Sequence, residues 1–226
     1  MIVRRRFIKS LVAGGILLPS IPQFLLGVEK GMDHSFSSIS DGSDMKEIRI
    51  ALIGKGGMGT ADTNTALSVG GVKLVAVCDL YDARLKLAKE QWGDHLFVTK
   101  DFQDILRRKD VDVVLIGTPD HWHQPIAIAA MKAGKHVYCE KPVIHKIEEG
   151  RELVDAQRAS GSYFQTGSQG MASLGNRKAR QLVQAGIIGK VNFVDGQFTG
   201  GPGTLGYYPI PEDASEKTIW WKQFIG

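Results

Sequence analysis

Short apolar runs alternate with amphipathic stretches from residue 48 onward. Short apolar runs between turn signals are typical of buried strands, whereas apolar positions three or four apart are typical of helices. Strands that alternate with helices at this pitch predict an α/β fold with a doubly wound parallel sheet. The expected strands are residues 48–53, 72–78, 112–117, 136–139 and 163–167, and the expected helices are one ending near residue 69 and residues 82–92, 123–134 and 147–161.

A glycine-rich loop follows the first strand. Gly54, Gly56 and Gly59 have the spacing in which the first glycine allows a tight turn, the second lets backbone approach a pyrophosphate, and the third lets a helix pack against the strand. The helix N-terminus at Gly57 and Met58 would offer N–H groups and partial positive charge to phosphates. The loop predicts a dinucleotide-binding, Rossmann-type domain; a simple glycine turn is the alternative.

Asp79 ends the second strand, 20 residues beyond Gly59. An acid at this point of the fold binds the ribose hydroxyls of adenosine and repels a 2′-phosphate, which favours NAD over NADP. Lys55 and Arg84 keep NADP possible, since either cation could neutralise the extra charge. A helix-capping role for Asp79 is the alternative interpretation.

The first 27 residues have a basic start and an apolar continuation, the layout of an export signal. The stretch "RRRFIK" (4–9) resembles the twin-arginine pattern, which predicts an exported, periplasmic protein. A basic N-terminus of a cytoplasmic protein is the alternative. Pro19 and Pro22 interrupt the apolar run, so membrane contact is expected only through an uncleaved signal. Residues 28–45, rich in Ser, Gly and Asp, are interpreted as a linker.

The net charge of +4 belongs to this leader, because the basic residues outside it equal the 24 acidic ones in number. A neutral body carries no electrostatic footprint for nucleic acid. Cys78 and Cys139 both end apolar runs, and we expect them to be core thiols. His121 and His123 have no accompanying cluster of carboxylates or cysteines, so no metal site is predicted.

Two further motifs join the glycine loop. Residues 116–142 connect the third strong strand to a Glu-Lys-Pro triplet, and Gly-Ser-Gln follows at 167–169. Together these stretches, within residues 46–198, resemble the glucose–fructose oxidoreductase / inositol dehydrogenase family (Gfo/Idh/MocA). The motifs that are specific in combination are Thr118-Pro119…His123 and Glu140-Lys141-Pro142.

The resemblance implies an NAD(P)-dependent oxidoreductase that moves hydride between nicotinamide and a hydroxyl of a sugar, polyol or glycoside. It implies that Lys141 reaches the substrate hydroxyl, where an ammonium group stabilises developing alkoxide charge. We expect burial and the cationic nicotinamide ring to favour its uncharged form. A solvated turn lysine is the alternative. The resemblance places at the cofactor Thr118, Pro119, His123, Glu140 and Lys141, and we expect at the substrate mouth His121, Trp122 and Gln169. For His121 and Trp122, ordinary surface loop positions are the alternative.

Residues 169–226 depart from the family pattern. The family's second domain is a large, mostly antiparallel sheet, and many members carry there an Asp-x-x-x-His pair that this sequence lacks after His145. We expect the truncated start of an α+β substrate and oligomerisation domain, with a helix at 177–186, a strand at 190–198 and exposed apolar surface. We expect Tyr207 and Tyr208 in packing or turns, with a substitute proton donor as the alternative role for either. Subunit contacts are the alternative for the aromatic residues of the tail, which include Trp220 and Trp221.

Three functions remain open at this point. The first is an NAD-dependent oxidoreductase acting on a carbohydrate, homo-oligomeric in its full-length form. The second is a glycosidase that uses bound NAD for transient oxidation, as some relatives do. The third is a nucleotide-binding fragment without catalysis.

Overall fold

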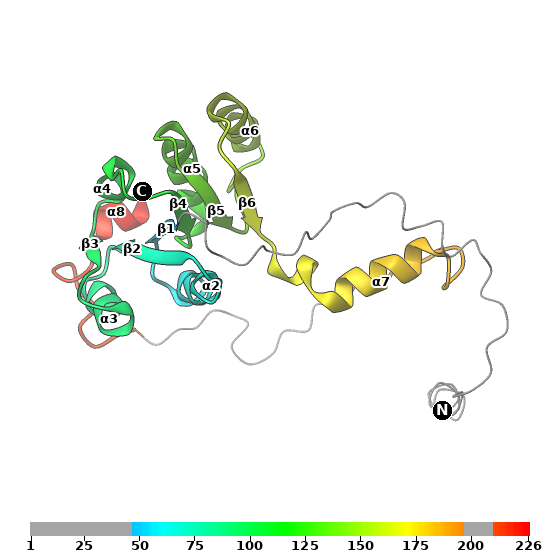
Figure 1. The fold of residues 1–226 in the computed structure, drawn as a ribbon, viewed down its shortest axis with the longest axis horizontal. Helices are drawn as coiled ribbons and strands as arrows, with labels where there is room; N and C mark the ends of the chain where they lie inside the picture. Colours follow the sequence, from blue (N-terminus) through cyan, green and yellow to red (C-terminus); the bar gives the residue numbers. More distant parts are fainter. Residues whose placement is uncertain (1–46, 197–209) are drawn as a thin grey trace. The chain divides into compact units, whose positions relative to one another are not determined.

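The computed structural model describes residues 47–196 and 210–226, and within them the expected doubly wound sheet is confirmed (Figure 1). Six parallel strands have the order β3-β2-β1-β4-β5-β6. The order reverses between β1 and β4, which is where ligands bind in folds of this class. The strands are β1 (Ile48–Ile53), β2 (Val72–Cys78), β3 (Phe97–Thr99), β4 (Val113–Ile116), β5 (His136–Glu140) and β6 (Phe164–Gly167).

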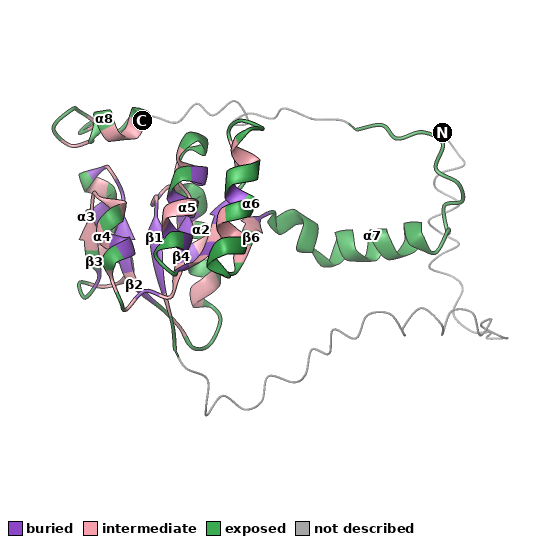
Figure 2. Cartoon of the chain, turned by 90° about the horizontal axis from the view of Figure 1, so that it is seen from above, coloured by how far each residue is buried: buried purple, intermediate pink, exposed green. Residues whose placement is uncertain are grey.

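Helices cover both faces of the sheet, so apolar side chains alternate between two cores (Figure 2). Ala51 and Ile53 of β1 pack with the face that carries α4, α5 and α6, whereas Ile50 and Leu52 pack with the face that carries α2 and α3. The helices are α2 (Gly57–Leu67), α3 (Asp82–Trp92), α4 (Phe102–Arg107), α5 (His123–Lys132), α6 (Glu149–Ser160), α7 (Leu174–Gln184) and α8 (Trp221–Ile225), with 3₁₀ turns η2 (Asp120–Trp122) and η3 (Gln169–Ala172).

Cys78 and Cys139 are buried free thiols, which confirms the expected core positions. Burial raises the pKa of Cys139 to about 12, and it raises the pKa of Cys78 as well. Both thiols therefore stay protonated at neutral pH and behave as small apolar side chains.

The sequence analysis does not predict the strand β3 or the helix α4, and one strand that it predicts is wrong. β3 and α4 are short, and β3 is a partly exposed edge strand, so neither produces a long apolar period. The strand expected at 190–198 is not formed over residues 190–196, and 197–198 lie outside the described residues. Residues 190–196 are exposed, and no neighbouring strand pairs with them. An extended segment without such a partner has no ladder of hydrogen bonds to hold it.

Residues 174–196 leave apolar surface exposed, as expected. α7 has no buried residue, and large apolar side chains remain open to solvent at Leu174, Ile187, Phe193 and Val194. The observed helix begins three residues before the expected one. The Ser173 hydroxyl accepts a hydrogen bond from the backbone N–H of Asn176 and so caps the helix.

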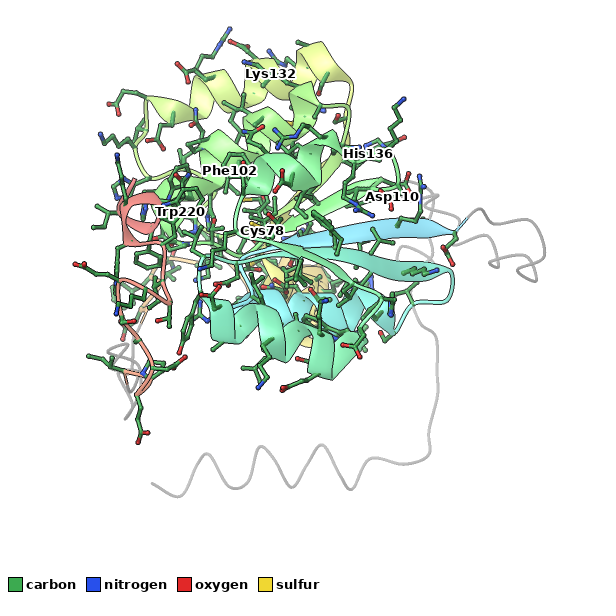
Figure 3. All side chains as sticks on the ribbon, turned by 90° about the vertical axis from the view of Figure 1, so that its left-hand side faces the viewer. Cys78, Phe102, Asp110, Lys132, His136 and Trp220 are labelled. Atoms are coloured by element: carbon green, nitrogen blue, oxygen red, sulfur yellow. The ribbon has the colours of Figure 1, made fainter. Side chains whose placement is uncertain are left out.

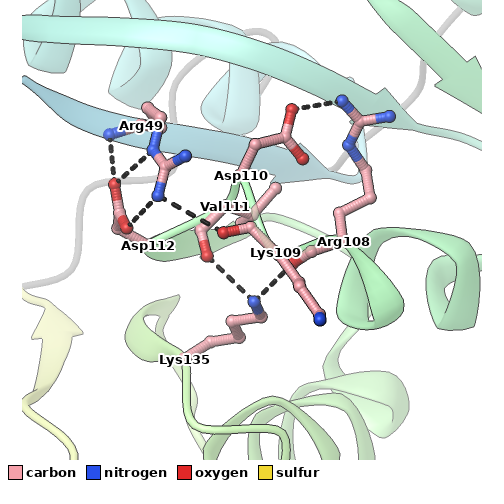
Figure 4. Close-up of polar contacts among 7 residues, drawn as sticks. All are labelled: Arg49, Arg108, Lys109, Asp110, Val111, Asp112 and Lys135. Atoms are coloured by element: carbon pink, nitrogen blue, oxygen red, sulfur yellow. Dashed lines mark hydrogen bonds and ion pairs between the residues drawn. The ribbon is translucent and has the colours of Figure 1, made fainter.

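A cluster of polar side chains lies at the amino ends of the strands (Figure 4). The guanidinium group of Arg49 donates to both carboxylate oxygens of Asp112, at 2.9 and 2.8 Å. Lys135 is 8% exposed, and its ammonium group donates to the carbonyls of Arg108 and Val111 at 2.5 and 2.9 Å. These groups satisfy one another and tie β1 to the segment that leads into β4.

Several predictions fall outside the described residues. The export signal (1–27), the linker (28–45) and the two tyrosines at 207 and 208 lie there and stay predictions. Among the residues that the structure does describe, no helix is long and apolar enough to cross a membrane.

Candidate functional site

The predicted site residues meet at the carboxyl ends of the parallel strands. Gly54 follows β1, Asp79 follows β2, Thr118 follows β4 and Lys141 follows β5, and all four line one cavity of about 720 Å³. A cavity of this size is typical of small-molecule and cofactor sites. In Figure 3, Trp220 marks this end of the sheet, whereas Asp110 and His136 mark the opposite end.

The glycine loop has the geometry that its sequence predicts. Gly54 has φ +93°, and a Cβ there would lie 2.7 Å from the backbone of Gly117. A Cβ on Gly59 would overlap the carbonyl oxygen of Gly54 and approach the side chain of Leu52. Any side chain at Gly54 or Gly59 would therefore push the turn away from the neighbouring strand end.

The first turn of α2 faces the cavity. Gly56 and Gly57 line it, and no atom outside the chain neighbours lies closer than 4.0 Å to a Cβ built at either position. Met58, half exposed, lines the same wall. The first N–H groups of a helix have no partner inside the helix, so they can bind phosphate oxygens. Open space beside these groups fits a pyrophosphate.

Asp79 is buried at 6% exposure and holds two loops together. One carboxylate oxygen accepts the Lys55 N–H at 2.7 Å, and the other accepts the Tyr81 N–H at 3.0 Å. Burial raises the pKa of Asp79, and the Arg84 guanidinium, 3.6 Å away, opposes that shift. The carboxylate thus fixes the glycine loop and also lines the cavity, where it can accept ribose hydroxyls.

The two cations considered for NADP lie differently. Lys55 is buried, donates to the Gln91 side chain at 3.2 Å and lies 4.9 Å from the centre of the Trp92 ring. Arg84 lines the cavity beside Asp79 and is about half exposed. Only Arg84, of these two, is placed where an added 2′-phosphate would meet it.

His123 links the two motifs of the family resemblance. It is 1% exposed, with Nε2 2.8 Å from the carbonyl oxygen of Thr118 and Nδ1 2.6 Å from that of Pro142. A carbonyl oxygen accepts, so a neutral ring can donate to only one of the two at a time. His123 lines the cavity, but its ring nitrogens are directed at backbone. It therefore positions the loops on either side of it.

Thr118 offers the cavity a hydrogen-bonding group. Its hydroxyl oxygen is buried and has no partner among the described residues, and the residue lines the cavity next to Pro119. A buried hydroxyl without a partner is uncommon and costly. A bound cofactor would supply the missing partner, so Thr118 and the glycine loop fit a dinucleotide.

Lys141 stands at the rim of the cavity and is exposed, so the burial that we expected for it is wrong. Its neighbour Glu140 is 4% exposed and accepts a hydrogen bond from the Gln169 amide. That amide also donates to Asp62 at 3.1 Å and to the Tyr138 hydroxyl at 2.9 Å. Gln169 thus joins α2, β5 and η3, and it does not line the cavity.

His121 and Trp122, expected at the substrate mouth, contact the C-terminal residues. His121 Nε2 lies 3.0 Å from the Phe224 carbonyl oxygen, and the Trp122 indole N–H donates to the same oxygen at 3.4 Å. Of the pair, only Trp122 lines the cavity. No group of three or more His, Cys, Asp or Glu side chains in residues 47–196 and 210–226 is placed to hold a metal ion.

Sequence reasoning missed part of the cavity wall. Tyr81 and Lys100 follow β2 and β3, so recognition of β3 would have directed attention to that edge. Residues of the C-terminal segment were expected in packing or subunit contacts, and no spacing signal linked them to the cavity. The additional lining residues from these two parts are Tyr81, Lys100, Phe102, Pro211, Ile219, Trp221, Gln223 and Phe224.

Known proteins share both the sequence and the fold. Inositol 2-dehydrogenase of Salmonella typhimurium is 28% identical over 174 residues, which are 76% of this chain and 52% of that protein. A glycosyl hydrolase family 109 protein of Solibacter usitatus is 32% identical over 155 residues, or 64% of this chain and 35% of that protein. The chain thus spans about half or less of the length of these relatives.

A solved structure of scyllo-inositol dehydrogenase from Lactobacillus casei, with bound NAD(H) and scyllo-inositol, is 34% identical to this chain. Its TM-score is 0.60, and the match covers 64% of this chain and 43% of that one. Myo-inositol 2-dehydrogenase from Lactobacillus plantarum has a TM-score of 0.61 and 31% identity, with coverage of 65% and 43%. The matched part is less than half of each of these two enzymes.

The family comparison agrees with the cavity. Residues 48–168, more than half of the chain, match the model of the oxidoreductase family with an NAD-binding Rossmann fold. That range contains the glycine loop, Asp79, the Thr118 loop and Lys141. The chain therefore belongs to the GFO_IDH_MocA oxidoreductase family, whose members have this NAD-binding fold.

Proposed function

We propose that the protein is an NAD-dependent oxidoreductase that acts on a secondary hydroxyl group of a polyol, sugar or glycoside. One observation carries the proposal: the glycine loop, the buried Asp79 and the exposed Lys141 line a single cavity. The inositol dehydrogenases among the relatives support a cyclic polyol as the first substrate class to test.

The residues divide between cofactor and substrate. Gly56, Gly57 and the first N–H groups of α2 would hold the pyrophosphate, and Asp79 the adenosine ribose. NAD, when bound, accepts the hydride. Lys141, which lines the cavity, would contact the substrate hydroxyl and stabilise the negative charge on its oxygen as the hydroxyl proton passes to solvent water. Its exposure keeps the ammonium group accessible to a substrate that arrives from solvent.

Two residues near Lys141, the buried His123 and the exposed Gln169, act as positioning groups. His123 contacts the carbonyl of Pro142, the residue after Lys141, and Gln169 donates to Glu140, the residue before it. The first contact holds the backbone beside the lysine, and the second holds the side chain of the residue before it. A lysine with a long flexible stem gains directional accuracy only when its backbone is fixed in this way.

The test follows NADH formation by absorbance, with the 226-residue chain and a panel of inositols, open-chain polyols and sugars. We expect Lys141→Ala to lower kcat by about 10²- to 10³-fold, the usual cost of removing one group that stabilises developing oxyanion charge. NAD affinity, measured by calorimetry, should stay unchanged. Lys146→Ala removes a nearby exposed lysine outside the cavity and serves as the matched control. A retained rate in Lys141→Ala would remove this lysine from the mechanism.

The glycosyl hydrolase family 109 relatives give a second candidate function, a glycosidase that uses bound NAD for transient oxidation. Both functions need the same cofactor cavity, so the products separate them. An aryl glycoside would be cleaved without net NADH formation in the glycosidase, whereas a polyol would yield one NADH per turnover in the dehydrogenase. NAD binding without either product would support a nucleotide-binding protein without catalysis.

A further inference from the structure

The C-terminal residues 210–226, here called the strap, pair with the loop that follows β2. The Asp82 N–H donates to the Thr218 carbonyl at 3.0 Å, and the Trp220 N–H donates to the Leu80 carbonyl at 3.0 Å. Tyr81 and Ile219 form an antiparallel bridge between these two hydrogen bonds. The strap is therefore held by backbone directly beside Asp79.

The other end of the strap contacts the loop that follows β4. There the Phe224 carbonyl oxygen lies within 3.0 Å of His121 Nε2 and accepts the Trp122 indole N–H at 3.4 Å. β2 and β4 are the two neighbours of β1 in the sheet. The strap thus connects the loops on both sides of the glycine loop, across the point where the strand order reverses.

The strap presents aromatic side chains to the cavity without filling it. Trp221 and Phe224 line the wall and pack edge to face, with ring centres 5.6 Å apart. They share the wall with Asp79 and Arg84, and about 720 Å³ remains between the strap and the Rossmann domain. Trp220, equally exposed at 43% against 40% for Trp221, does not line the cavity.

The strap lies beside the residues at which we expect the adenosine half of the cofactor. Asp79 marks the adenosine ribose, and the strap is anchored on the three residues after it. The adjoining base, a purine, has two apolar faces that stack on aromatic side chains. Lys141, at which we expect the nicotinamide end of the cofactor, makes no hydrogen bond or ion pair with residues 210–226.

We propose that Trp221 and Phe224 are further cofactor-binding residues, which form an aromatic wall for the adenine of NAD. The strap lies outside residues 48–168, which match the nucleotide-binding family model. The cofactor site is thus completed by a segment distant in sequence, and this inference rests on NAD binding by the cavity.

Calorimetric titration of the 226-residue chain with NAD, ADP-ribose and nicotinamide mononucleotide tests the proposal. Alanine substitution of a stacking aromatic typically weakens binding by about 5- to 150-fold. We expect that loss for NAD and ADP-ribose in Trp221→Ala, a smaller loss in Phe224→Ala, and unchanged mononucleotide binding. Trp220→Ala is the matched control and should bind like the wild type. Trp221→Phe should restore most of the affinity, which separates stacking from general damage to the fold.

Three outcomes would overturn the aromatic wall. Unchanged ADP-ribose affinity in Trp221→Ala would show that the ring does not contact adenosine. Equal losses for all three ligands would indicate a general change in the cavity. Tighter binding would show that the strap competes with the cofactor. A wild-type chain that binds neither NAD nor ADP-ribose would instead refute the proposed function itself, and with it the inference.

Discussion

Replacement of Asp79 by alanine separates two roles of one carboxylate. In the structure the group accepts the N–H groups of Lys55 and Tyr81, and it also lines the cofactor cavity. The first role shapes the glycine loop and should matter equally for NAD and NADP. The second role applies to the adenosine ribose, whose 2′-hydroxyl is free in NAD and phosphorylated in NADP. The ratio of the two affinities therefore isolates the ribose contact.

The magnitudes follow from the hydrogen bonds. A hydrogen bond to a charged group contributes about 1.5–3 kcal/mol, so loss of the ribose contact should weaken NAD binding by about 10- to 150-fold. Each N–H group left unsatisfied in a buried place costs about 1–3 kcal/mol of folding free energy. Relief of the burial that raises the pKa of Asp79 offsets part of that cost. NADP should lose less affinity, because Arg84 is released and the repulsion of a 2′-phosphate disappears.

Isothermal titration with NAD and NADP at one fixed ionic strength measures the ratio, and thermal unfolding measures the loop effect. Glu90→Ala is the control, since it removes an exposed carboxylate from α3, the helix that follows Asp79, at a position that does not line the cavity. We expect the NAD:NADP preference to fall at least tenfold in Asp79→Ala and to stay constant in the control. Equal losses for both cofactors would mean that Asp79 serves only to hold the loops.

Two further predictions concern the same part of the fold. Gly59→Ala should destabilise the protein by about 1–3 kcal/mol and abolish NAD binding, because its Cβ would overlap the Gly54 carbonyl; a normal melting temperature and affinity would contradict this. NAD affinity should decline on acidification at a pH above the ordinary Asp value of about 3.9, since burial raises the pKa of Asp79, and Asp79→Asn should remove that decline. For stability the sign is opposite: the raised pKa stabilises the fold below the unfolded-state value, and this contribution disappears as pH rises through the folded-state value.

The sequence predicts the fold best where burial dictates the residue pattern. Residues 48–53, 72–78 and 82–92 were assigned with the bounds that the structure has, because their apolar periods are long and end in turn residues. β3 has three residues, two of them half-buried, so alternation could not be recognised there. The strap was missed for a related reason: a single bridge between Tyr81 and Ile219 is a contact between distant residues with no period of its own.

Some residues of the candidate site can likewise be predicted from local sequence, whereas others need the fold. Gly54 and Gly59 follow from local geometry, since a turn with positive φ and a close approach between strand and helix permit few residue types. His123 could be placed at the site but not given its role, because its partners, the carbonyls of Thr118 and Pro142, belong to two loops that only the fold brings together. Motif spacing therefore locates a residue, whereas its hydrogen bonds decide whether it binds the ligand or holds the loops that do.

The buried polar groups show why the cavity can exist before a cofactor enters. Regular backbone pairing stops where the strands end, so the loops beyond need other partners. Asp79 supplies two acceptors to the backbone of two loops, His123 joins two others, and the Gln169 amide donates to the buried carboxylate of Glu140. Three of these hydrogen bonds join segments that belong to different strands: Asp79 with Lys55, His123 with Pro142, and Gln169 with Glu140. Together they fix the segments that line the cavity, where the Thr118 hydroxyl has no partner among the described residues and stays available to a ligand.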